Sequence, residues 1–260
     1  MKRSNPRRQA RPVAKKTVAR IAGLPAVAAL FSVASDRVER LFFDQRARSK
    51  AAPFCAKLAR ARKPYRLVES DELERIAGTV LHGGIVAIAR PRPVHAFDPD
   101  AARLWARDGQ PLLILDGVSN PHNLGAIART AAFFGLPRMV LSDHPAQALP
   151  SDASYRVSEG GFEHIELYRA PQLADALKGL KACYRIVAAA PGRHRELSEL
   201  SRGDKPFALV LGNEEQGLPN VTMAACDDIV TIPGAGSIQS LNVAASAAIL
   251  LYALSAASRR

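Results

Sequence analysis

Residues 111–260 alternate short apolar runs with helical segments, and this alternation constrains the fold more than any other feature. The apolar runs are PLLILDGV, RMVLSD, FEHIELYRA, YRIVAAAP, FALVLGNE and DIVTIP. Helical patterns lie at NLGAIARTAAFFG, near residues 171–181 and at the apolar C-terminal segment 241–257. Strands that alternate with helices form mostly parallel sheets covered on both faces. We therefore expect an α/β domain over residues 111–260.

A smaller α/β unit is expected upstream, over residues 21–90. Helix and strand patterns alternate there in the segments PAVAALFSVASD, VERLFFD, PFCAKLARAR, YRLVE, SDELERIAG and GGIVAIAR. Residues 91–110 mix prolines, charges and the single tryptophan, and they interrupt the periodicity. We expect a linker or docking segment between the two domains.

The positive charge is concentrated in the first quarter of the chain. Residues 1–66 hold 18 Lys and Arg against three acids, whereas the net charge of the whole chain is +12. Residues 1–20 contain no acid and almost no large apolar residue, so we expect a disordered basic arm there. Such an arm favours RNA or DNA as its partner, and a solubilising or expression-related tail is the alternative.

Other sequence features disfavour secretion and membrane insertion. Cys55, Cys183 and Cys226 lack the number and spacing of a disulfide framework or a zinc site, which favours a cytoplasmic location. No apolar signal segment follows the N-terminal charges, and polar residues interrupt the apolar helix at 241–257. We expect no membrane-spanning helix and no metal.

Polar residues follow three of the expected strands, at the sheet edge where parallel α/β proteins bind ligands. Asn123 is expected to cap the helix that carries Gly125 and, about one and a half turns further on, Arg129. Glu214 and Gly217 follow FALVLG, and GAGSIQSLN follows DIVTIP. Taken singly, each has an ordinary interpretation as a helix cap, a solvated arginine or a carboxylate beside a helix start.

The last of these loops lacks the features of common nucleotide and hydrolase sites. Gly234 and Gly236 lie between a strand and a helix, but Gln239 occupies the third glycine position of a dinucleotide fingerprint. The sequence also lacks a G-x-S-x-G elbow, a phosphate-loop lysine and a zinc-binding pair of histidines. Nicotinamide enzymes, hydrolases, kinases and metalloenzymes are therefore disfavoured.

Together, the three loops resemble the SpoU, or TrmH, family of RNA ribose 2'-O-methyltransferases. The first family motif matches NLGAIAR at Asn123, Gly125 and Arg129. The second and third motifs match the following residues: Gly212, Glu214 and Gly217, then Ile232, Pro233, Gly236, Ser240, Leu241 and Asn242. Gly234 departs from the pattern, because relatives commonly carry Met at this position.

The resemblance covers both parts of the chain and implies a fold. PAVAALF and HGGIVAI look like the family's small N-terminal RNA-binding domain, which has a ribosomal-protein-like α/β fold. The C-terminal part would be an α/β-knot, in which the last helix passes through a preceding loop to form a trefoil knot beside a mostly parallel sheet. The resemblance also implies a homodimer through the C-terminal domain, with active sites assembled at the subunit interface.

The resemblance further implies S-adenosylmethionine as the cofactor, held among the loops that follow the last strands. Small residues in these loops let the backbone approach a ligand closely. The residues expected to bind the cofactor are Ala189, Leu211, Gly212, Asn213, Gly217, Ile232, Pro233, Gly236, Ser240 and Leu241.

The same resemblance implies catalysis by Arg129, with Asn123, Glu214, Ser240 and Asn242 orienting the arginine, the hydroxyl and the loops. A guanidinium stays protonated, so we interpret Arg129 as a bidentate phosphate clamp that fixes the ribose and favours the developing oxyanion. The expected function is methylation of a ribose 2'-hydroxyl in structured rRNA or tRNA. A catalytically inactive RNA-binding module and a knotted methyltransferase acting on an RNA base are the alternatives.

Overall fold

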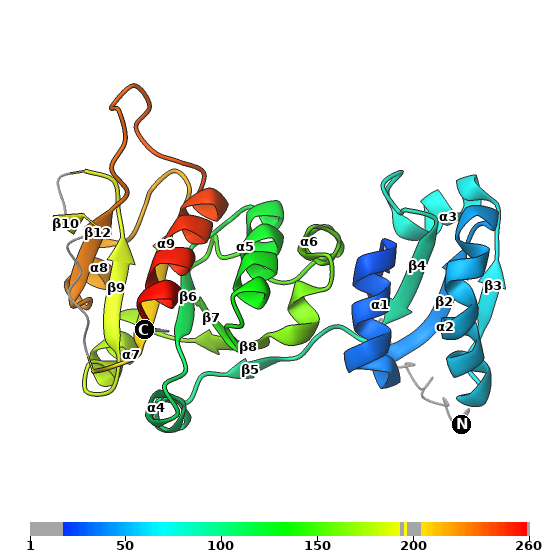
Figure 1. Cartoon of the computed structure of the whole chain (residues 1–260), viewed down its shortest axis with the longest axis horizontal. Helices are drawn as coiled ribbons and strands as arrows, with labels where there is room; N and C mark the ends of the chain where they lie inside the picture. The colour runs from blue at the N-terminus through cyan, green and yellow to red at the C-terminus, as the bar shows by residue number, and fades with distance from the viewer. Residues whose placement is uncertain (1–17, 193–194, 197–203, 259–260) are drawn as a thin grey trace, which may run out of the picture.

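A computed structural model of the chain describes residues 18–192, 195–196 and 204–258, which form two sheets with their covering helices (Figure 1). The N-terminal sheet has the strand order β1-β4-β2-β3, and the C-terminal sheet has the order β10-β12-β9-β11-β6-β7-β8-β5. Within the described ranges, no helix is long and apolar enough to cross a membrane.

The N-terminal domain follows the predicted alternation, with one strand that the prediction missed. Its elements are β1 Ala19–Ala22, α1 Leu24–Val33, η1 Ser35–Arg37, β2 Val38–Phe43, η2 Gln45–Ala47, α2 Arg48–Arg60, β3 Tyr65–Leu67, α3 Ser70–Ala77 and β4 Ile85–Ala89. β1 pairs with β4 from Ala19 onward, so Ala19 and Arg20 do not belong to a disordered arm as predicted. Residues 1–17 of that arm lie outside the described residues.

The C-terminal domain is built on a parallel sheet, as predicted. Its elements are β5 Val94–Ala96, α4 Pro99–Arg107, β6 Leu112–Asp116, α5 Pro121–Phe133, β7 Arg138–Ser142, α6 Asp152–Ser158, η3 Gly161–His164, β8 Glu166–Ala170, α7 Leu173–Leu180, β9 Arg185–Ala189, β10 Arg195–Glu196, β11 Phe207–Gly212, α8 Asn220–Ala224, β12 Asp228–Thr231 and α9 Val243–Ser258. Every strand pair of this sheet is parallel across the part of the chain that the structure describes.

The segment predicted as a linker, residues 91–110, is instead an ordered part of the C-terminal domain. Strand β5 pairs with β8 at the sheet edge, where a short strand flanked by prolines is tolerated. Helix α4 begins after Asp98, whose side chain accepts a hydrogen bond from Asp100 N, and Pro99 takes the first helical position. The prolines and charges of residues 91–110 therefore mark an edge strand and the start of a helix, and they do not mark a linker.

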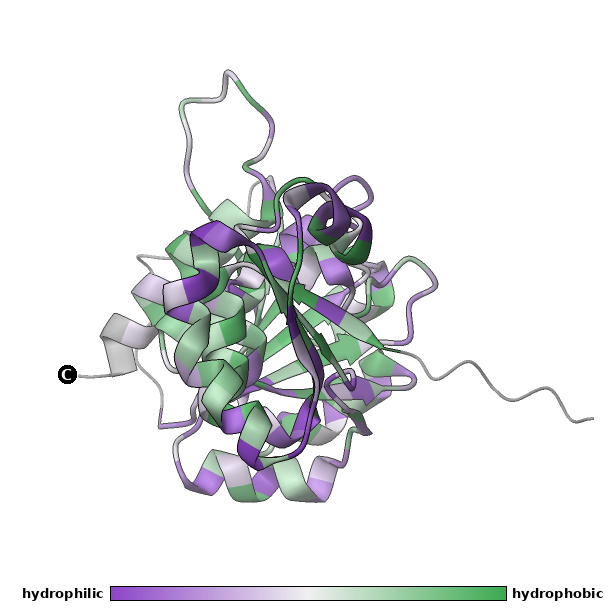
Figure 2. Ribbon diagram, turned by 90° about the vertical axis from the view of Figure 1, so that its right-hand side faces the viewer, coloured by the Kyte–Doolittle hydropathy of each residue, from purple (hydrophilic) through white to green (hydrophobic). Residues whose placement is uncertain are grey.

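Helices cover both faces of the parallel sheet, as its unbroken apolar strands require. Leu113 and Leu115 of β6 pack in one cluster with buried residues of α5 and α9, whereas Leu112 and Ile114 pack in a second cluster with buried residues of α4 and α7. Figure 2 shows the hydrophobic residues gathered on the central strands. Because these strands are parallel, the carboxyl ends of β6, β9, β11 and β12 lie at one edge of the sheet.

The first sequence motif lies on α5, which follows β6 at this edge, and the second and third motifs lie on loops that leave it. In Figure 1 the segment between β12 and α9 projects from the body of the domain, and α9 then returns to lie beside α5. The trefoil knot that the resemblance implies stays a prediction.

Candidate functional site

The carboxylate of Glu214 connects the loops that follow β6 and β11. Its Oε1 atom accepts hydrogen bonds from Asn123 Nδ2 at 2.8 Å and from Asn120 N at 3.1 Å. Its Oε2 atom accepts from the backbone N and the Oγ of Ser119, both at 3.0 Å. One acidic side chain therefore fixes the start of α5 against the second motif.

These hydrogen bonds keep Glu214 ionised at neutral pH. Partial burial by itself raises the pKa of the carboxyl group, but the bonds from Ser119, Asn123 and Asn120 outweigh burial, and the pKa lies below its ordinary value. The carboxylate faces the N-terminal turn of α5, where a negative charge is favoured.

The loop that carries Glu214 folds tightly because of two glycines and an asparagine. A Cβ atom on Gly212 would lie 2.6 Å from the carbonyl carbon of Gly217, so no larger residue fits there. Gly217 has a φ of +70°, and it exchanges both backbone hydrogen bonds with Asn213 at 3.0 Å. Asn213 Nδ2 donates to Gly117 O at 2.7 Å, which joins this loop to the end of β6.

Asn123 does not cap α5, contrary to the prediction. Asn120 is the cap residue: its Oδ1 accepts from His122 N at 2.8 Å, and Pro121 opens the helix. The side chain of Asn123, in the first turn, is therefore free to bind Glu214 and to accept a hydrogen bond from Asn242 Nδ2 at 3.1 Å. Glu214, Asn123 and Asn242 thus join all three sequence motifs in one network.

Arg129 lies outside this network in a single chain. Six positions beyond Asn123, it is about 9 Å further along the helix and is rotated by roughly 240° around its axis. Its Nη2 atom pairs with Glu159 Oε2 at 2.9 Å, and both side chains are about half exposed. Glu159 follows α6 and has a φ of +46°, so the arginine meets a sharp corner after that helix.

Gly125 has a packing role that the motif alone did not reveal. A Cβ atom there would lie 2.6 Å from Ser154 O and 2.9 Å from Val157 Cβ, both on α6. Only glycine lets α5 approach α6 this closely. The first motif therefore places three roles on one helix: Asn123 binds Glu214, Gly125 packs against α6, and Arg129 is exposed.

The predicted cofactor residues gather at the carboxyl ends of three adjacent strands. Ala189 ends β9, Leu211 and Gly212 end β11, and Ile232 follows β12. These strands are neighbours in the sheet, with β9 between β11 and β12.

The remaining predicted residues lie on the projecting loop. Pro233, Gly236, Ser240 and Leu241 are exposed there, and Ser240 takes no part in the network around Glu214. Gly236 has a φ of +83° and open space around it.

This arrangement suits a bent, polar ligand held mainly by the backbone. The ends of β9, β11 and β12 bring main-chain groups together. At Gly212 the backbone has no side chain, so a ligand can approach the main chain closely there. These features fit S-adenosylmethionine. Among the described residues, no group of three or more His, Cys, Asp or Glu side chains is placed to hold a metal ion.

Sequence reasoning missed Ser119, Asn120 and Glu159. The Asn-Pro pair at 120–121 is a helix-start signal that identifies the cap. Ser119 and Glu159 carry no local signal, because their partners Glu214 and Arg129 come from distant parts of the chain.

Comparison with protein families identifies matches to both domains. The model of the family described as SpoU rRNA Methylase family matches residues 110–252. The model described as RNA 2'-O ribose methyltransferase substrate binding matches residues 20–94.

Named relatives match most of the chain. The 23S rRNA (guanosine-2'-O-)-methyltransferase RlmB of Acinetobacter baylyi is 33% identical over 242 residues, which cover 88% of this chain and 94% of that protein. The RlmB protein of Escherichia coli K12 is 31% identical, with 89% and 96% covered. The crystal structure of the SpoU methyltransferase AviRb from Streptomyces viridochromogenes in complex with AdoMet has the same fold, with a TM-score of 0.72, 23% identity, and 92% and 90% covered.

Proposed function

This chain belongs to the SpoU family of RNA methylases, and we propose that Asn123, Arg129, Glu214, Ser240 and Asn242 form its methyl-transfer site. The protein is an S-adenosylmethionine-dependent RNA 2'-O-ribose methyltransferase. The observation that carries the site assignment is the network of Glu214, Asn123 and Asn242, because it connects all three motifs.

The cofactor would be held by the strand ends and the loop after β12. Gly212 and Asn213 offer backbone atoms at the end of β11, and Ile232 does so after β12. When bound, S-adenosylmethionine supplies an electrophilic methyl group on a sulfonium. Ser240 and Leu241 lie on the adjoining loop, which would close over it.

The side chains would act by positioning and electrostatics. Arg129 stays cationic, so it would bind a phosphate of the substrate through two parallel N–H groups and stabilise the developing oxyanion. Glu214 would hold Asn123, whose amide in turn holds Asn242 and the start of α9. Fixing a hydroxyl in line with a reacting group can supply several kcal/mol of the barrier without a metal.

The substrate that we propose is a guanosine ribose in large-subunit ribosomal RNA. The support is the printed activity of the RlmB relatives, which match this chain over nearly their whole length. The N-terminal domain adds exposed basic side chains around α2, namely Arg46, Arg48, Lys50, Arg60 and Arg62. They would meet the phosphate backbone, which gives affinity but little sequence information. A tRNA substrate is the other outcome.

A homodimer through α5 and α9 is part of the proposal. These helices lie side by side, and Phe133, Ile249 and Tyr252 are exposed apolar residues on them, with 82%, 41% and 66% of their surface accessible. An apolar patch of this kind marks an interaction surface. An active site shared between two chains would also account for the separation of Arg129 from Asn242 within one chain.

We place the enzyme in the cytoplasm. Cys55, Cys183 and Cys226 are all free thiols, as is usual in a reducing compartment.

Transfer of tritium from labelled S-adenosylmethionine to ribosomal RNA tests the site. Arg129→Ala should lower the rate on the order of a hundredfold, as for loss of one transition-state donor, and should leave cofactor affinity nearly unchanged. Alkaline hydrolysis of the product distinguishes the alternatives, because a 2'-O-methyl group blocks cleavage at that nucleotide and a base methyl group does not. A folded protein that transfers no label to ribosomal RNA or to tRNA is an RNA-binding module.

A further inference from the structure

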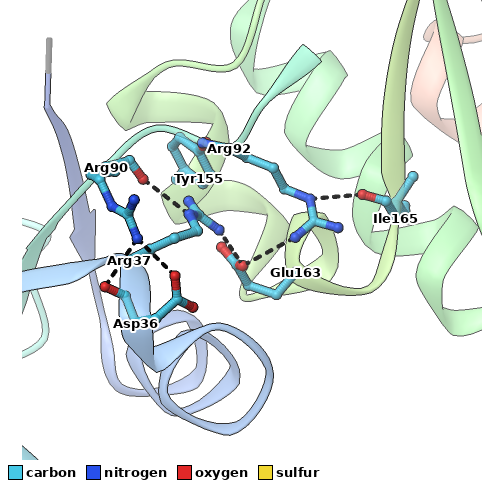
Figure 3. Close-up of polar contacts among 7 residues, drawn as sticks. All are labelled: Asp36, Arg37, Arg90, Arg92, Tyr155, Glu163 and Ile165. Atoms are coloured by element: carbon cyan, nitrogen blue, oxygen red, sulfur yellow. Dashed lines mark hydrogen bonds and ion pairs between the residues drawn. The ribbon is translucent and has the colours of Figure 1, made fainter. Parts of the chain in front are cut away.

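A buried ion cluster joins the two domains of the chain. Glu163 of η3 has a side chain that is 2% exposed, and its Oε2 atom lies 2.5 Å from Arg37 Nη1 and 3.5 Å from Arg92 Nη1. Figure 3 shows the two arginines converging on this carboxylate, one from the N-terminal domain and one from the segment that connects the domains. The contact therefore links three separate parts of the fold.

The connecting segment is fixed on both sides of this cluster. Arg92 donates from its backbone N to the hydroxyl of Tyr155 at 2.8 Å and from Nε to Ile165 O at 2.8 Å (Figure 3). Arg37 Nε donates to Arg90 O at 3.0 Å. The segment then leads directly into β5, which is the edge strand of the large sheet and pairs with β8. The segment is bound along its length, so the N-terminal domain does not hang from a free tether.

The corner that carries Glu163 also packs against Arg129. A Cβ atom on Gly161 would lie 2.8 Å from Arg129 Cα, and one on Gly160 would lie 2.4 Å from Ala29 Cβ of helix α1. Two adjacent glycines thus place the backbone of the corner against the proposed catalytic helix on one side and against the N-terminal domain on the other. The side chain of Glu159, one residue earlier, pairs with Arg129.

Stability alone is a poor explanation for this cluster. A buried ion pair loses the solvation of both charges, and well-packed hydrophobic residues often stabilise a fold equally well. Arg37 Nη2 and Glu163 Oε1 are buried without a hydrogen-bond partner, and this adds to the free-energy cost of burying the cluster. Directional bonds to one carboxylate from Arg37 of the N-terminal domain and from Arg92, between β4 and β5, do, however, define a single orientation.

We propose that Glu163 is a positioning residue, which locks the N-terminal domain onto the corner at residues 159–163. The lock holds Arg129 and the exposed basic side chains around α2 as one rigid body. This rests on the proposed function, since it takes Arg129 as the arginine that meets the reacting ribose. Without the lock, RNA would still bind, but its ribose would be presented to Arg129 in many orientations.

Spin labels measure the rigidity directly. Cysteines introduced at the exposed positions Lys50 of α2 and Lys178 of α7, in a chain whose native cysteines are replaced by alanine, report the distance between the domains. Dilution with unlabelled chains restricts the signal to pairs within one molecule. The parent should give one narrow distance distribution.

Two variants remove the lock in different ways. Glu163→Gln removes the charge of the carboxylate. The double change Arg37→Met with Glu163→Leu replaces the 2.5 Å ion pair by apolar side chains, a replacement that is often neutral for stability, while Arg92 keeps its hydrogen bond to Ile165 O. Both should broaden the distance distribution and lower kcat for RNA methylation by about tenfold to a hundredfold, because small misplacements of reacting groups have effects of this size. The affinity for S-adenosylmethionine should change less than about twofold, as expected when only orientation is lost.

Asp152→Asn is the matched control. Asp152 also pairs across the domains, with Arg20 at 3.1 Å, but both side chains are nearly half exposed, so this pair contributes little. The control should keep the narrow distribution and the parental kcat.

The proposal is overturned if the double variant keeps a narrow distribution or methylates at the parental rate. Arg129→Ala separates this failure from failure of the proposed function. If Arg129→Ala is inactive while the Glu163 variants are normal, only the positioning role is wrong; if Arg129→Ala is fully active, the assignment of the site is wrong.

Discussion

Replacing Gly125 by alanine tests whether the first motif depends on close helix packing. The added methyl group would meet Ser154 O at 2.6 Å and Val157 Cβ at 2.9 Å. The nearest of these atoms belongs to the backbone of α6 and cannot rotate away. Helix α5 must therefore shift, and with it Asn123 and Arg129.

The size of the effect follows from two opposing contributions. An extra methyl group in a close-packed site destabilises by about 1–3 kcal/mol, and a clash with backbone belongs to the upper half of that range. Alanine also gains about 1 kcal/mol over glycine in helix propensity. We expect a net destabilisation of about 1–2 kcal/mol, and a melting temperature that falls by roughly 2–8 °C.

Gly179→Ala is the matched control, because Gly179 also lies in a helix but has no atom within 4 Å of an added Cβ. It should gain up to about 1 kcal/mol from propensity alone. Urea denaturation followed by circular dichroism measures both variants, and the tritium assay measures their methylation. Gly125→Ala should also methylate more slowly, whereas Gly179→Ala should match the parent. If the two substitutions shift stability in the same direction, the packing explanation of the motif glycine is wrong.

Three further predictions concern the charge, the interface and the basic arm. Glu214 has a pKa below its ordinary value, so it stabilises the fold at pH above about 4.3, and this contribution disappears as the pH falls through the lowered pKa. The stability difference between the parent and Glu214→Gln, measured by denaturation, should therefore shrink in acid; a constant difference would refute the hydrogen-bonded carboxylate. Phe133→Asp should convert a dimer at tens of micromolar into a monomer in sedimentation with little loss of monomer stability, because the ring is 82% exposed; a parent that is monomeric at that concentration excludes the dimer. Deleting residues 1–17, which hold seven Lys and Arg, should weaken RNA binding and flatten its salt dependence while the methylated nucleotide stays the same; an unchanged salt slope would make the arm a passive tail.

The sequence was sufficient to predict the sheet and the order of the motifs, because both depend on local patterns. Continuous apolar runs such as FALVLG are typical of strands buried on both faces, and their alternation with helices indicates a parallel sheet. The prediction missed strands β1 and β5, because contacts with distant parts of the chain decide whether these strands form. Strand β1 forms because it pairs with β4, whose paired residues lie 64 to 70 positions further along the chain, and β5 forms because it extends the edge beside β8.

The same limit applies to the site. The three motifs identified Glu214, Asn123 and Asn242, but the hydrogen bonds between them required the strand ends to be brought together. The pairing of Arg129 with Glu159 had no local signal, since it depends on the corner after α6. Helix α6 itself was missed, because its seven residues are too short for a clear apolar period.

Mapping of ribose methylation in ribosomal RNA tests the central claim most directly. RNA from cells that lack this gene should have lost a 2'-O-methyl group at one nucleotide. Expression of the parent protein should restore it, whereas expression of Arg129→Ala or Asn242→Ala to the same level should not. Full restoration by Arg129→Ala, or loss of a base methyl group in place of a ribose methyl group, would contradict the site and the reaction assigned to it.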